Sequence, residues 1–186
     1  MSETWEYQVR DASRIAAVNN SGLVGLSNDD AFDRLLELAI VVTGASRGVI
    51  ALVDATHTTA ISAVGFPEGL PLFAPIAYSF CRYVVGFGQP FLVDDSLNDP
   101  RTIDDPAIDA FGAVAWIGFP VEDGLGHVLG NFCLMDPEPH EWTAVDIQTV
   151  ATLAQAVGTE IALRRERALS LIICEKLTEL EERSIP

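Results

Sequence analysis

The period of apolar and polar residues changes several times along the chain. Apolar residues three and four positions apart predict helices over 10–19 and 29–43, the second capped by the polar run 27–30. A long periodic segment begins at Thr143, where Asp146 completes a capping box. The sequence therefore predicts helices near both ends of the chain.

Short runs rich in β-branched residues interrupt the helical pattern and predict strands. These runs are 48–54, 58–64, 91–94, 113–121 and 127–135. Between them we expect a short helix over 79–86, and at most a helical turn after Pro106 in the acidic segment 94–109. Strands that follow one another through short turns pair antiparallel, so this order indicates an α+β fold. We expect the terminal helices on one face of its sheet and the loops and short helices on the other.

Charge and hydropathy narrow the class of protein. The 186 residues carry 11 Lys and Arg against 27 Asp and Glu, a net charge of −16, yet 49% of them are hydrophobic. Such a chain is neither a disordered acidic tail nor suited to nucleic acid. The longest uncharged stretch, 15–28, is interrupted by polar residues and is too short for a membrane span, and the N-terminus lacks a signal-peptide pattern. We therefore expect a cytoplasmic protein with no membrane partner.

The three cysteines, Cys81, Cys133 and Cys174, have no close spacing. This pattern favours reduced thiols over a disulfide framework or a thiolate metal site. Cys81 follows Ser79 and precedes Arg82, so we expect its thiol near a cation and a helix start, where thiols become reactive.

Short segments distributed along the chain carry a family resemblance. They are 32–39, 79–86, 89–95, 99–101, 118–121, 130–136 and 160–164. Their order and spacing resemble GAF domains of bacterial signalling proteins over about residues 10–165. The resemblance implies a central antiparallel sheet of about six strands, a helical layer that dimerises, and a pocket on the opposite face roofed by about 65–109. It divides the chain into an N-terminal extension (1–9), a GAF domain (10–165) and a C-terminal helical extension (166–186).

The resemblance implies sensing or scaffolding beside an effector such as a histidine kinase, a diguanylate cyclase or a phosphatase. We expect a homodimer that associates through its first and last helices and passes the state of a ligand or partner along the extension 164–182. There, a four-three-four spacing from 173 to Ser184 predicts a short coiled-coil seam. The residues predicted to face the second copy are Val157, Ile161, Ala168, Ile173, Leu177 and Leu180. The alternatives are a scaffold without ligand and a thiol redox sensor acting through Cys81.

The predicted pocket combines aromatic walls with a few polar groups that orient a ligand. Its candidate residues are Phe66, Tyr78, Phe80, Cys81, Arg82, Arg101, Trp116, Phe119, Asn131 and Phe132. Arg101 is also expected to pair with Asp94 or Asp95. The cofactor or ligand itself is not identified by the sequence.

Several specific chemistries are disfavoured. The cysteine context does not match bilin attachment or the free methionine sulfoxide reductases, and the dipeptides of cyclic-nucleotide GAF domains are missing. Histidines fall in turns, which disfavours haem, and the acidic run lacks calcium-loop spacing. Because no catalytic motif is present either, we expect no metal site and no enzyme activity.

Overall fold

The structure is a computed structural model that describes residues 4–25, 29–67 and 73–183. The predicted N-cap residues 27 and 28, most of the loop 65–71 and the predicted seam position Ser184 lie outside this described part. All statements below concern the described residues.

One antiparallel sheet of six strands forms the centre of the molecule, in the order β3-β2-β1-β6-β5-β4. Its strands are β1 (Arg47–Val53), β2 (His57–Val64), β3 (Phe73–Pro75), β4 (Phe91–Val93), β5 (Ala115–Glu122) and β6 (Val128–Asp136). The α+β prediction is therefore confirmed, and the predicted strand runs match the structure. The three-residue edge strand β3 lies in a segment for which the sequence predicted no element.

The sheet is covered on both faces. Side chains of the central strand β1 alternate between two apolar cores, with Ile50 and Leu52 in one and Val49, Ala51 and Val53 in the other. A strand buried on both sides reads as a continuous apolar run, because both faces of its pleat need apolar side chains. The two cores explain why β1 lacks the polar positions of a half-exposed strand.

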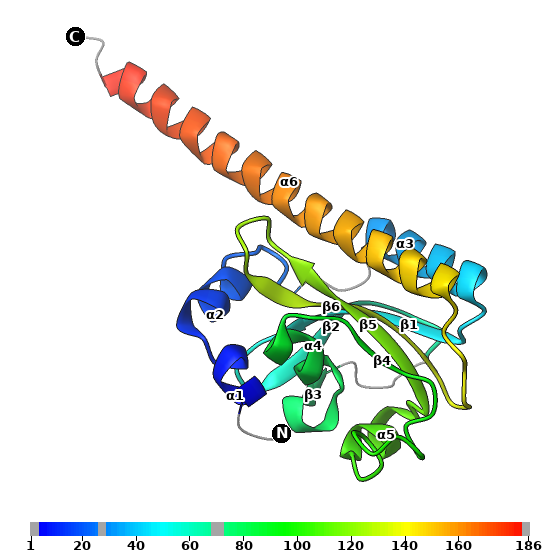
Figure 1. The fold of residues 1–186 in the computed structure, drawn as a ribbon. Helices are drawn as coiled ribbons and strands as arrows, with labels where there is room; N and C mark the ends of the chain where they lie inside the picture. The colour runs from blue at the N-terminus through cyan, green and yellow to red at the C-terminus, as the bar shows by residue number, and fades with distance from the viewer. Residues whose placement is uncertain (1–3, 26–28, 68–72, 184–186) are drawn as a thin grey trace.

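The first face is covered by α3 (Asp30–Thr43) and α6 (Ala144–Arg183), with α2 (Ala12–Asn19) beside them (Figure 1). Asp29 caps α3 by accepting from the Ala31 amide at 3.0 Å. Thr143 and Asp146 exchange backbone-to-side-chain hydrogen bonds at 2.8 and 3.3 Å, so the predicted capping box is confirmed. The C-terminal half of α6 extends beyond the domain (Figure 1).

The second face carries α1 (Thr4–Val9), the 3-10 turn η1 (Ile76–Tyr78), α4 (Cys81–Phe87) and α5 (Pro106–Phe111). Helix α1 packs against α4, and the Val9 side chain is buried in the core of this face. The sequence predicted no helix over 1–9 and expected the terminal helices together on the opposite face. Six residues are too few for a clear periodic signal, so the packing of α1 could not be read from the pattern.

The sequence predicted no membrane-spanning segment. In the described part of the chain, no helix combines the length and the apolar character that a membrane crossing requires.

Candidate functional site

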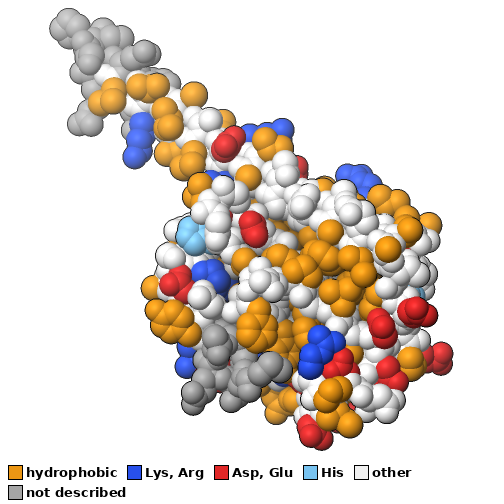
Figure 2. Space-filling model, in the orientation of Figure 1, with side chains coloured by type: hydrophobic (Ala, Val, Ile, Leu, Met, Phe, Trp, Pro, Cys, Tyr) orange, Lys and Arg blue, Asp and Glu red, His pale blue; other side chains and the backbone are white. Residues whose placement is uncertain are grey.

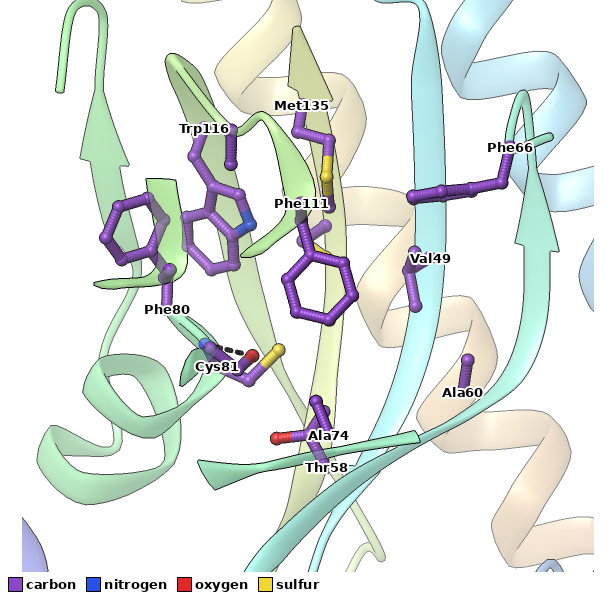
Figure 3. A pocket seen from close by; sticks show the side chains of 14 residues that line it. Val49, Thr58, Ala60, Phe66, Ala74, Phe80, Cys81, Phe111, Trp116 and Met135 are labelled. Atoms are coloured by element: carbon purple, nitrogen blue, oxygen red, sulfur yellow. Dashed lines mark hydrogen bonds between the residues drawn. The ribbon is translucent and has the colours of Figure 1, made fainter. Parts of the chain in front are cut away.

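A cavity of about 40 Å³ lies between the second face of the sheet and the roof formed by α4 and α5. Its floor comes from β1, β2, β5 and β6, and its walls are mostly apolar (Figure 3). The lining residues are Val49, Thr58, Ala60, Phe66, Ala74, Ser79, Phe80, Cys81, Ala107, Phe111, Ala113, Trp116, Cys133 and Met135. The cavity therefore lies on the face where the resemblance places a pocket.

Four of the predicted pocket residues meet at this cavity: Phe66, Phe80, Cys81 and Trp116. Phe80 and Trp116 stack edge to face with ring centroids 5.9 Å apart, a geometry that aromatic quadrupoles favour. In Figure 3 the Cys81 sulfur points into the space beside the Phe111 ring. The aromatic signal in the sequence thus located part of the wall.

Other predicted residues lie elsewhere. Tyr78 is 48% exposed, and Phe132 belongs to the core on the opposite face of the sheet. Phe119 lines a groove between β5 and α6, also on that opposite face. Residues of β5 and β6 alternate between faces, so an aromatic residue one position out of phase cannot reach the cavity.

Arg82 does not line the cavity, because its guanidinium is held within the roof. It is buried and forms an ion pair with Asp105, and it donates to the carbonyl oxygens of Ala77 at 2.9 Å and Ser79 at 2.8 Å. The Tyr83 hydroxyl donates to the same Asp105 carboxylate at 2.7 Å. Burial and this carboxylate raise the pKa of Tyr83. The sequence predicted Arg82 as a residue that orients a ligand, whereas in the structure its guanidinium holds the roof together.

The Arg82–Asp105 pair connects two parts of the roof. Asp105 also caps α5 by accepting from the Ala107 amide at 2.9 Å. Helix α5 supplies Ala107 and Phe111 to the cavity wall, so this carboxylate fixes α5, and with it that part of the wall, to α4. We call Arg82, Tyr83 and Asp105 the roof latch.

Arg101 lies away from the cavity, in the acidic loop after β4. It pairs with Asp99 at 2.5 Å and donates to the Leu92 carbonyl at 2.8 Å. The predicted partners Asp94 and Asp95 are thus replaced by Asp99, two residues from Arg101 in the chain. The hydrogen bond from Arg101 lowers the pKa of Asp99.

Asn131 is completely buried on β6, and neither of its amide atoms has a regular hydrogen-bond partner in the described structure. The hydroxyl of Thr58, which lines the cavity, is buried without a partner as well. Buried polar atoms are usually satisfied, because an unpaired one costs about 1–3 kcal/mol. These groups are unexplained by the packing of the fold alone.

Cys133 is the site residue that the sequence prediction missed. It lies two positions after Asn131 on β6, opposite Val49 of β1, and its side chain faces the cavity. The neighbouring Cys133 thiol lowers the pKa of Cys81, whereas Cys81 and burial raise the pKa of Cys133. Alternation along 131–135 places Asn131, Cys133 and Met135 on one face, a signal that could have found it.

Metal-binding side chains do not gather anywhere in the part of the chain that the structure describes. Groups of three or more His, Cys, Asp or Glu residues arranged to hold an ion are not found among those residues. The acidic loop instead uses its carboxylates locally, as Asp95 and Asp99 do with nearby backbone amides.

Comparison with protein families gives a match to the model described as GAF domain over residues 27–161, which is more than half of the chain. The chain is also similar to a cyclic di-GMP phosphodiesterase of Pseudomonas aeruginosa, at 27% identity over 134 residues. The matched part is 72% of this chain and spans only 22% of that relative's length.

Solved structures with similar folds come from proteins of different kinds. A domain of a putative two-component sensor histidine kinase from Sinorhizobium meliloti has a TM-score of 0.58 at 21% identity, covering 77% of this chain and 99% of that one. The GAF domain of a phosphoenolpyruvate-protein phosphotransferase from Coxiella burnetii has a TM-score of 0.62 at 15% identity, and the match covers 88% of this chain and 98% of that one. A free methionine-R-sulfoxide reductase from Thermoplasma acidophilum has a TM-score of 0.58 at 10% identity, and the match covers 71% of this chain and 90% of that one. At these identities the likeness establishes the fold alone.

Proposed function

Because the chain belongs to the GAF domain family, we propose that it is a sensory or regulatory module of bacterial signal transduction that dimerises through α6. The observation that carries the proposal is the apolar stripe on the projecting half of this helix. Similarity to a phosphodiesterase and to a sensor kinase domain supports an effector of that kind as the partner, with the module in the cytoplasm.

Helix α6 carries two apolar stripes on different sides. The stripe that faces the sheet is formed by Val150, Leu153, Ala154, Val157 and Ile161. The second stripe is formed by Leu169, Ile173, Leu177 and Leu180, each more than half exposed. At about 100° per residue, the second stripe is rotated about 140° from the first. We call the second stripe the α6 seam. It faces away from the side of the helix that packs on the sheet.

This geometry changes the predicted dimer interface. Val157 and Ile161 are buried in the core of their own chain, so they are not available to a second copy. Ala168 continues the core-facing side of the helix. The proposed interface keeps Ile173, Leu177 and Leu180 and adds Leu169.

The amount of exposed apolar surface supports a partner helix as the occupant of the seam. Figure 2 shows hydrophobic side chains at several places along the projecting helix, between charged and polar ones. Burying one Leu or Ile side chain contributes about 1.5–3 kcal/mol. A four-three spacing from Ile173 to Leu180 suits knobs-into-holes packing, so a second copy of the same helix fits it.

For the sensory role, we propose that the cavity admits a small molecule. A volume of about 40 Å³ holds only a few water-sized molecules, whereas typical ligand pockets measure about 300–1,000 Å³. A larger ligand therefore requires α5 to move, and the roof latch opposes that movement. The unpartnered Thr58 hydroxyl supports a ligand with one hydrogen-bonding group and an otherwise apolar body.

A scaffold without ligand is the second candidate, favoured by the small volume of the cavity. Native mass spectrometry of protein purified from its host distinguishes the two. A retained small molecule supports sensing, and its absence together with an intact dimer supports the scaffold. Neither form of the proposal assigns a catalytic reaction to the chain.

The α6 seam can be tested with a matched pair of substitutions. Leu177→Asp places a charge in the seam, and Leu171→Asp makes the same change on the opposite side of the helix, where Leu171 is 66% exposed. Sedimentation velocity of both variants should show dissociation for Leu177→Asp alone, because only that carboxylate is buried on association. Equal behaviour of the two variants would remove the seam from the proposal.

A further inference from the structure

We propose that Cys81 and Cys133 are a redox pair in which a small hydroperoxide oxidises Cys81 and Cys133 then closes a disulfide between α4 and β6. This goes beyond the proposed function, because it requires neither a second copy of the chain nor a bound ligand. It makes the cavity an entry site for a reactive small molecule.

The two thiols meet across the cavity from different elements. Cys81 begins α4 and is 5% exposed, whereas Cys133 lies in the middle of β6 and is fully buried. Both line the same cavity, and each thiol shifts the pKa of the other. A disulfide requires neighbouring thiols, because it fixes the distance between the two backbones.

The surroundings give the two thiols different roles. The Cys133 thiol, the Ser79 hydroxyl and the Asn131 amide all favour the ionised form of Cys81, and they lower its pKa against the opposing effect of burial. The pKa of Cys133 is raised by Cys81 and by burial. The thiolate is the nucleophile, and Cys81 at the start of α4 is also the more accessible of the two thiols, so we assign the first attack to Cys81 and the second to Cys133.

The burial of Asn131 also fits a charged or altered sulfur at this site. Its amide is completely buried beside both thiols without a regular hydrogen bond, a costly arrangement around neutral groups. A thiolate on Cys81, or the oxygen of a sulfenic acid there, would accept a hydrogen bond from the Asn131 amide. The unsatisfied donor in the reduced, neutral state is then explained.

The size of the cavity selects the oxidant. Hydrogen peroxide occupies about the volume of two water molecules, and a cavity of about 40 Å³ accommodates it next to Cys81. In Figure 3 the Cys81 sulfur and the Thr58 hydroxyl face this space. Bulky organic hydroperoxides and oxidised glutathione exceed this volume.

The reaction balances in two steps. The Cys81 thiolate attacks one peroxide oxygen, the O–O bond breaks, and the leaving hydroxide takes a proton to give water and a sulfenic acid on Cys81. The Cys133 sulfur then attacks the Cys81 sulfur, the S–O bond breaks, and the departing hydroxide takes the Cys133 proton as a second water. Two thiols lose two electrons in total, and one peroxide is reduced to two waters.

The test uses the full chain with Cys174→Ser, which removes the exposed cysteine and leaves both buried thiols native. After exposure to hydrogen peroxide, intact mass should fall by two hydrogens, and digestion should yield one peptide pair linking Cys81 to Cys133. Dithiothreitol should reverse both changes. The proposal is overturned if both thiols stay free while methionines oxidise, or if Cys81 oxidises further and Cys133 remains a thiol.

Two further variants in the same background assign the roles. With Cys133→Ser, intact mass should show one oxygen added at Cys81, and dimedone added as the chain is unfolded should trap it as a sulfenic acid. With Cys81→Ser, Cys133 should stay unmodified. Labelling of Cys133 at the rate seen for Cys81 would contradict the assigned order. Circular dichroism confirms that each variant is folded before its thiols are compared, and the dimer measurement above is unaffected by any of these outcomes.

Discussion

At the scale of single residues, the chemistry of the cavity depends on partners far apart in the sequence. The sequence predicted Cys81 at a pocket, and in the structure Cys81 lines the cavity while the Ser79 hydroxyl accepts from its amide at 3.2 Å. The expected cation Arg82 instead points to Asp105, and the groups that face the thiol are Asn131 and Cys133. Contacts across some 50 positions follow from sheet register, which a local motif does not contain.

The roof latch yields a prediction at this scale. Asp105→Asn keeps an N-cap for α5, because Asn caps helices as well as Asp, but it leaves the buried Arg82 guanidinium without this carboxylate. Removing one partner of a buried ion pair costs about 3 kcal/mol or more, so urea unfolding should show a clear loss of stability.

Asp99→Asn is the matched control for this experiment, because it removes the carboxylate of the more exposed Arg101 pair. Its effect should stay below about 1 kcal/mol. Equal losses for the two variants would mean that the latch contributes no more than a surface ion pair.

At the scale of elements, long periodic segments were predictable and short ones were not. Helices α3 and α6 and the strands β5 and β6 follow from apolar spacing and from the capping residues, since each has enough residues for a period to show. Elements α1 and β3 have six and three residues, and their positions depend on packing against α4 and β2. The sequence likewise did not show that the two apolar stripes of α6 face different directions. Only the packing of the core shows where the stripe that faces the sheet ends.

Helices α3 and α6 are joined by an ion pair whose contribution depends on pH. Arg164 of α6 pairs with the α3 cap residue Asp29 at 2.5 Å, and its guanidinium lies 4.7 Å from the centre of the Phe32 ring. Hydrogen bonding to Arg164 lowers the pKa of Asp29. A carboxylate with a lowered folded pKa stabilises the protein above its unfolded pKa, and this contribution is lost as the pH falls through the folded value.

Asp29→Asn tests this linkage, because Asn preserves the cap and removes the charge. Near neutral pH the variant should be less stable than the unchanged chain by about 0.5–1 kcal/mol, the range of a partly exposed pair. The difference should shrink as the pH falls below about 4, where the unfolded carboxyl begins to bind protons. Chemical unfolding at several pH values measures it, and a difference independent of pH would show that charge plays no part.

At the scale of the whole molecule, three regions of the described structure hold much of the apolar content of the chain. Two cores fill the two faces of the sheet, and the α6 seam accounts for a third, exposed share. The positive mean hydropathy of +0.27 is thus explained without a membrane-crossing helix in the described structure. The acidic excess of 27 Asp and Glu over 11 Lys and Arg contrasts with the apolar side chains of the proposed seam.

Mass in solution is the most direct test of the central claim, that this GAF domain works as a dimer joined along α6. Sedimentation equilibrium of the unchanged full chain, followed over a range of concentrations, reports it without any substitution. The account predicts a species of twice the 20.1 kDa chain mass that dissociates on dilution. A single-chain mass at every concentration would contradict it.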